Sequence, residues 1–120
     1  MADSLKVGLN ARVKLVKNTT KVLFDQLFQP VDADYTLHAG QSLAINASGS
    51  STLNFGSIVT VRHLVLQVDR SANLKINASA TAVPLNANGV FFAANASLTS
   101  IKVINNSATY TLTVNYLGTD

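Results

Sequence analysis

The beginning of the chain alternates between apolar and polar residues without interruption. From residue 5 to residue 15, every odd position is apolar and every even position is polar or glycine. Successive side chains of an extended strand point to opposite faces, so a period of two is typical of a half-buried strand. The pattern therefore predicts a strand here and places Lys6, Arg12 and Lys14 on its polar face.

From residue 34 onward, short apolar segments alternate with turn residues. The segments that predict strands cover residues 43–47, 59–68, 74–78, 90–92, 98–104 and 110–116. Asn88 and Gly89 form a strong turn signal because both residue types tolerate positive φ. We also predict a turn over residues 38–41 and a hairpin turn at 105–107 between the last two strands.

Two segments are less regular. Residues 21–28 suit either one short helix or a strand, and we favour a strand. Residues 59–68 are apolar on both faces around residues 64–66, which is typical of a central strand covered on both sides.

Many short strands separated by turns predict an all-β fold. Two packed antiparallel sheets allow each strand to bury one face, as the alternation requires. We therefore predict an antiparallel β-sandwich of jelly-roll type with about eight to ten short strands. An immunoglobulin-like sandwich is the alternative, but the chain lacks the Cys and Trp markers of that fold. We interpret residues 1–20 as a basic N-terminal strand or arm and residues 21–120 as the sandwich, within one domain overall.

The composition is poor in charge. Hydrophobic residues make up 48% of the chain and charged residues 12%, whereas charged residues usually account for about 25%. A charged surface generally keeps a monomer soluble, so a surface with little charge is suited to being covered. The composition therefore favours self-association or a permanent partner.

The positive charges concentrate at the N-terminal end. The net charge is +3, and the cations of the first 21 residues are opposed there by one acid, Asp3. Such a basic segment could bind an acidic surface, and the alternative is an ordinary solvated strand face. The candidate partner-binding residues are these cations, Lys6, Arg12, Lys14, Lys17 and Lys21.

Few residues could carry chemistry. The chain has no cysteine, and neither of its histidines, His38 and His63, lies in a nucleophile motif. Asp32 and Asp34 could share a cation on one side of an extended chain, but calcium takes about six to eight oxygen ligands and no neighbouring loop supplies them. We predict no catalytic residue, no metal site and no cofactor, and we interpret the protein as not an enzyme.

Membranes and nucleic acids are not predicted partners. No apolar run approaches the roughly 18 residues of a membrane span, and the first five residues do not read as a signal peptide. The basic strand contains no aromatic residue on which a base could stack, which argues against nucleic-acid binding. Because the first five residues do not read as a signal peptide, the sequence predicts synthesis in a cytoplasm.

From residue 35 onward the chain resembles the small jelly-roll structural proteins of tailed bacteriophages, notably the capsid decoration (cement) proteins. The resemblance is a style of sequence and not a diagnostic motif. It lies in residues 35–43 (YTLHAGQSL), 63–69 (HLVLQVD), 84–92 (PLNANGVFF), 100–107 (SIKVINNS) and 110–118 (YTLTVNYLG).

This resemblance implies a virion protein of the capsid surface that self-associates, commonly as a homotrimer, and clamps subunits of the major capsid protein. It supplies no site residues. Phage tail and baseplate modules share the same style, so a tail location stays open. A carbohydrate-binding sandwich is a further alternative, with Tyr35, Asp32 and Asp34 as its candidate cluster.

Overall fold

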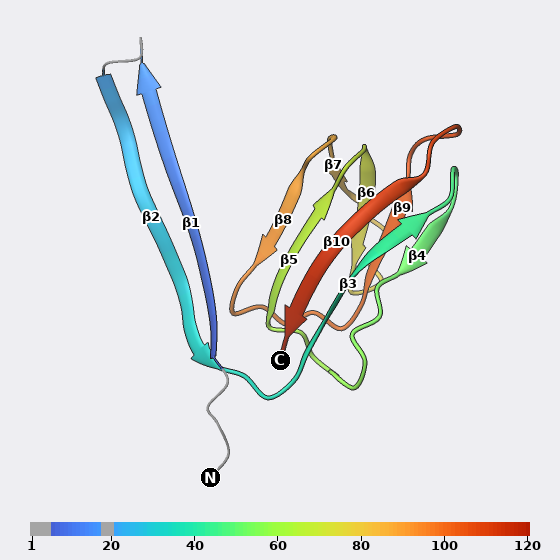
Figure 1. Ribbon diagram of the computed structural model, residues 1–120, viewed down its shortest axis with the longest axis horizontal. Helices are drawn as coiled ribbons and strands as arrows, with labels where there is room; N and C mark the ends of the chain where they lie inside the picture. The colour runs from blue at the N-terminus through green and yellow to red at the C-terminus, as the bar shows by residue number, and fades with distance from the viewer. Residues whose placement is uncertain (1–5, 18–20) are drawn as a thin grey trace. The chain divides into compact units, whose positions relative to one another are not determined.

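The computed structural model describes residues 6–17 and 21–120, which contain strands and no helix. The chain divides into two compact units, Met1–Tyr35 and Thr36–Asp120. The strands in chain order are β1 (Lys6–Lys17), β2 (Lys21–Asp34), β3 (His38–Ile45), β4 (Ser50–Thr52), β5 (His63–Val68), β6 (Ala72–Ile76), β7 (Val83–Leu85), β8 (Val90–Ala93), β9 (Ile101–Asn105) and β10 (Leu112–Thr119) (Figure 1).

The first unit is a two-stranded antiparallel ribbon of β1 and β2. The register runs from Lys17 opposite Lys21 at one end to Lys6 opposite Asp34 at the other, with two irregularities between them. The strands that we predicted at residues 5–15, from Lys6 onward, and at 21–28 are confirmed. Within the ribbon, the structure describes the side chains of Arg12, Lys14, Lys21, Val22 and residues 25–27.

The second unit contains the other strands, arranged in two four-stranded antiparallel sheets. The strand orders are β3-β10-β5-β8 and β4-β9-β6-β7 (Figure 1). Counted from β3, these orders are 1-8-3-6 and 2-7-4-5, which is the interleaved arrangement of an eight-stranded jelly roll. The predicted all-β jelly-roll sandwich is therefore confirmed.

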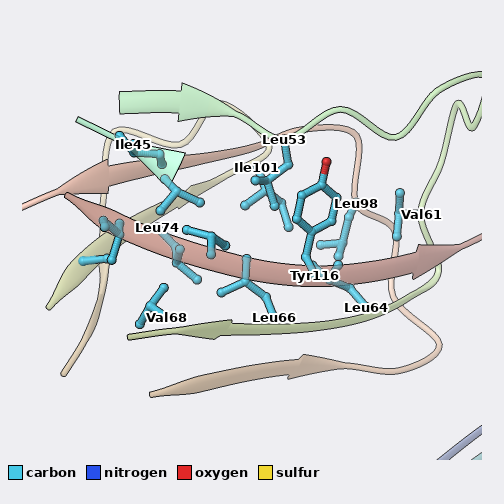
Figure 2. Packing of buried hydrophobic residues seen from close by; sticks show 14 residues of the cluster. Ile45, Leu53, Val61, Leu64, Leu66, Val68, Leu74, Leu98, Ile101 and Tyr116 are labelled. Atoms are coloured by element: carbon cyan, nitrogen blue, oxygen red, sulfur yellow. The ribbon is translucent and has the colours of Figure 1, made fainter. Parts of the chain in front are cut away.

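The core lies between the two sheets. Inward-facing positions alternate along β5 and β10, where Leu64, Leu66 and Val114 are completely buried, and Leu74 and Ile101 meet them from the other sheet (Figure 2). Burial of one such large aliphatic side chain stabilises a fold by roughly 1.5–3 kcal/mol. This core accounts for the rigidity of the sandwich without disulfides.

The predicted turn at residues 38–41 is wrong, because these residues belong to β3. Gly40 lies opposite Leu117 of β10, and a Cβ built on it would collide with the carbonyl oxygen of Tyr116. The glycine thus allows two strands to approach closely, and this role looks the same as a turn glycine in the sequence.

The predicted hairpin between the last two strands is also wrong. β9 belongs to one sheet and β10 to the other, so residues 106–111 cross between the sheets. Asn105 is buried at the start of this crossing, and its amide nitrogen donates hydrogen bonds to the carbonyl oxygens of Ile45 (3.2 Å), Asn46 (3.1 Å) and Tyr110 (2.8 Å). The segment that resembled a hairpin loop is a buried polar junction.

Other boundaries also differ from the prediction. The strand predicted at residues 59–68 begins at His63, and Val61 before it makes an isolated bridge with Leu98. The compact sandwich unit begins at Thr36, whereas the prediction started the sandwich at residue 21, because residues 21–34 pair with β1. The turn at Asn88 and Gly89 is confirmed, with Asn88 at a φ of 64°.

Candidate interaction surfaces

The candidate partner-binding cations all lie on the ribbon. Lys6, Arg12, Lys14 and Lys17 belong to β1, and Lys21 begins β2. The side chains of Arg12, Lys14 and Lys21 are exposed, whereas those of Lys6 and Lys17 lie outside the described residues. The structure therefore places all five positions on the two strands of the ribbon.

Folding of the ribbon also brings acids to this basic strand. Asp25 lies opposite Lys14, and Asp34 lies opposite Lys6 in the register. The first 35 residues contain five cations and four acids, so their net charge is only +1. The sequence shows a basic N-terminal end because the acids lie further along the chain. Asp25 follows Lys14 by 11 residues, and Asp34 follows Lys6 by 28.

Arg12 and Asp25 form the best-defined contact of the ribbon. The Nε and Nη2 atoms of Arg12 donate to the two carboxylate oxygens of Asp25 at 2.9 Å and 2.7 Å. The hydrogen bonds from Arg12, more than the charges of Arg12 and Lys14, hold the pKa of Asp25 below its ordinary value. This bidentate geometry fixes β1 against β2 but uses up one of the cations that a partner would need.

The ribbon presents apolar side chains and free strand edges. Val22 and Leu27 are each about half exposed, at 52% and 51%. In the described residues, β1 pairs only with β2, so each strand keeps one edge of backbone donors and acceptors for a further strand. An isolated two-stranded ribbon is at best marginally stable in water, so this element is suited to binding another surface.

A second surface is the outer face of the sheet β3-β10-β5-β8. Leu117 lies opposite Val65, and Val65 lies opposite Phe92, so the three side chains form a row on one face of the sheet. Leu117 is 52% exposed, and a shallow hollow of about 450 Å³ adjoins it and Val65. None of the four strands contains Lys, Arg, Asp or Glu, so this face is uncharged.

Sequence reasoning found this surface only in part. We expected the strand around residues 64–66 to be covered on both sides, and Leu64 and Leu66 are indeed buried. Val65 points to the outer face and is half-buried within this chain. The apolar run at residues 64–66 therefore predicted burial on both faces, but within the single chain the outer face at Val65 is only half-buried.

The two histidines differ in burial. His63 is buried at the start of β5, and its Nδ1 accepts a hydrogen bond from the backbone N–H of Asn95 at 3.2 Å. Burial, with a smaller effect of the Arg62 charge, lowers the pKa of His63. His63 is thus a neutral packing residue, whereas His38 is exposed at the start of β3.

The remaining candidates give no site that the structure describes. Asp32 and Asp34 lie in β2, but their side chains are outside the described residues. Among the side chains that the structure describes, no group of three or more His, Cys, Asp or Glu residues comes together that could hold a metal ion. The same residues contain no helix long and apolar enough to cross a membrane.

No protein-family model matches the chain, and no curated protein matches it. Among solved structures, the chain is similar to a de novo designed double-stranded β-helix, with 15% identity and a TM-score of 0.48, over 68% of this chain and 99% of that chain. It is also similar to the cupin domain of Cnp3 from Schizosaccharomyces pombe, with 10% identity and a TM-score of 0.48, over 92% of this chain and 88% of that chain. Similarities of this size carry nothing about activity or partners.

Proposed function

We propose that this protein is a non-enzymatic structural protein that attaches to the surfaces of other proteins. Following the resemblance in its sequence, we propose that it decorates and stabilises the capsid of a tailed bacteriophage. It would do so as a homotrimer bound to the major capsid protein. The observation that carries the proposal is the β1–β2 ribbon, a compact unit of its own in which, among the described residues, each strand pairs only with the other.

The ribbon suits attachment through strand pairing. An extended segment of a partner can add to either free edge, where main-chain hydrogen bonds supply affinity and neighbouring side chains supply specificity. The exposed Val22 and Leu27 would add apolar contacts beside such an edge. Because the ribbon contains three acids against five cations, we expect attachment to persist at high salt.

The uncharged sheet suits self-association. A copy of the same chain can approach this face without repulsion between like charges, and its apolar row around Leu117 gives the contact a hydrophobic centre. An oligomer that presents several ribbons at once would gain avidity on a repeating shell, since each further contact becomes intramolecular.

Jelly rolls serve in viral capsids and lectins, and they also occur as cupins, so the fold alone decides nothing about activity. The proposal is tested by mixing the purified protein with phage capsids that lack accessory proteins and counting the copies bound per particle. We expect saturation at hundreds of copies. No binding, or a handful of copies per particle, would exclude a shell protein and favour a tail or non-virion role.

A further inference from the structure

Two lysines stand side by side on the outer face of the second sheet. Lys75 of β6 lies directly opposite Lys102 of β9, and Thr52 of β4 lies directly opposite Lys102 on its other side. Residues paired in this way point to the same face of a sheet. Like charges directly opposite each other destabilise a sheet, so this lysine pair lowers the stability of the protein.

The lysine pair borders a hollow of about 320 Å³. Thr52, Ser79 and Ser100, which carry hydroxyl groups, also line it, and no acidic residue does. The lining therefore combines two ammonium groups with hydroxyl donors around a space that an anionic group can enter.

Within the sandwich unit, both acids are engaged elsewhere. A carboxylate oxygen of Asp69 accepts the backbone N–H of Thr113 at 2.8 Å. Asp120 accepts the backbone N–H groups of Thr36 and Leu37, both at 2.9 Å. The sandwich thus provides no carboxylate to balance Lys75 and Lys102.

One of the other two cations of the sandwich has an aromatic partner. The guanidinium of Arg70 lies 4.2 Å from the centre of the Tyr110 ring. The sandwich contains four cations and two acids, so its net charge is +2.

The rim of the hollow is held in place by one side chain. Asn77, at a φ of 53°, accepts the backbone N–H of Thr99 at 2.7 Å through its Oδ1 and donates to the carbonyl oxygen of Ser97 at 2.9 Å. This bridge joins the turn that carries Ser79 to the loop that carries Ser100. A rim fixed before binding lowers the entropic cost of holding a ligand.

We propose that Lys75 and Lys102, with the hydroxyl groups around them, bind a single tetrahedral oxyanion, namely a phosphate or sulfate group. Lysine binds such groups as a point charge, and hydroxyl groups donate hydrogen bonds to their oxygens. The anion supplies the countercharge that the sandwich lacks. This site is separate from the proposed attachment to a capsid and does not depend on it.

The test is a titration of the isotope-labelled full chain with inorganic phosphate and with sulfate, followed by amide NMR shifts at low ionic strength. We expect saturable shifts centred on Lys75, Ser79 and Lys102. The variants Lys75→Gln and Lys102→Gln should each weaken binding roughly three- to tenfold, as for partly exposed charged contacts. Lys21→Gln, the same chemical change on the ribbon, should leave the affinity unchanged.

Chloride at matched ionic strength separates specific binding from screening. Equal shifts with chloride, or affinities unchanged in both lysine variants, would overturn the proposal. A sugar phosphate distinguishes two sources of the ligand: tighter binding than inorganic phosphate indicates a group carried on a larger molecule. Equal binding indicates the free ion, and both results agree with an oxyanion site.

Thermal unfolding gives a second readout for the variants. Without anion, Lys102→Gln should melt at the same or a higher temperature than the wild type, because it removes the repulsion from Lys75. Sulfate raises the melting temperature of proteins in general. The readout is therefore how much more sulfate raises the melting temperature of the wild type than that of Lys102→Gln. Equal rises in the two proteins would contradict the site.

Discussion

The side-chain amide of Asn105 donates a hydrogen bond to the carbonyl oxygen of Tyr110 at 2.8 Å and thereby ties the end of β9 to the segment that leads into β10 in the other sheet. The same nitrogen serves the carbonyl oxygens of Ile45 and Asn46, and the Oδ1 atom accepts the backbone N–H of Ser107 at 2.9 Å. One buried amide therefore forms hydrogen bonds with the backbone of residues 45–46 and of the crossing at residues 106–111.

Replacement of Asn105 by Asp should destabilise the sandwich strongly. The carboxylate cannot donate a hydrogen bond, so the carbonyl oxygens of Ile45, Asn46 and Tyr110 lose this amide donor and face a buried negative charge. We expect a loss of about 3 kcal/mol in the free energy of unfolding, measured by urea denaturation at neutral pH. Asn106→Asp, at the exposed neighbour, is the matched control and should change stability by less than about 0.5 kcal/mol. A small loss at both positions would contradict the role of the junction.

This junction also shows where sequence reasoning reached its limit. The alternation of residues 98–104 and 110–116 correctly indicated two strands, because burial of one face acts locally along each strand. The residues between them resemble a hairpin loop, and only the three-dimensional positions of Ile45 and Asn46 show that Asn105 is a buried bridge. Which strands pair depends on such distant contacts, which no local pattern contains.

His63 should make stability fall in mildly acidic solution. Burial lowers the pKa of His63 in the folded state below its unfolded value of about 6.5, so folding favours the neutral ring. The stabilisation is complete above the unfolded pKa and is lost as the pH falls through the lower folded pKa. Urea unfolding at pH 7 and pH 5 should show this loss in the wild type and less of it in His63→Gln. An equal pH dependence in the two proteins would show that His63 is not responsible.

The ion pair of the ribbon should be visible in the titration of Asp25. The pKa of this carboxyl group lies below the ordinary aspartate value, so the pair stabilises the ribbon above that value and is lost as the pH falls through the folded pKa. Carboxyl ¹³C NMR should record the lowered pKa in the wild type and a return toward the ordinary value in Arg12→Gln. A titration unchanged by that substitution would mean that the ribbon does not hold this contact in solution.

Self-association through the uncharged sheet should be removed by a single charge. We expect light scattering at micromolar concentration to give the mass of a trimer for the wild type, against 12.7 kDa for one chain. Leu117→Lys places a buried charge at the centre of the proposed contact and should yield monomers. Val59→Lys, at a position that is 84% exposed, is the control and should remain a trimer. A monomeric wild type would contradict self-association directly.

The candidate site could be predicted from the sequence less well than the fold. Four of the five cations lie in β1 and Lys21 begins β2, and pairing of the two strands places Asp25 opposite Lys14 and Asp34 opposite Lys6. The lysine pair was not found at all, since Lys75 and Lys102 are 27 positions apart and become neighbours only through sheet pairing. The strand register determines which charged residues become neighbours across strands, and the alternation of apolar and polar residues does not reveal that register.

The central claim is that the ribbon attaches this protein to a phage capsid. The most direct test is the number of copies bound per accessory-free capsid by the wild type, by the double variant Val22→Ser with Leu27→Ser, and by the matched control Val59→Ser. We predict saturation at hundreds of copies for the wild type and the control, at low and high salt, and a loss of at least about tenfold in affinity for the ribbon variant, as for two lost apolar contacts. Undiminished binding of the ribbon variant, or no binding of the wild type, would contradict the claim.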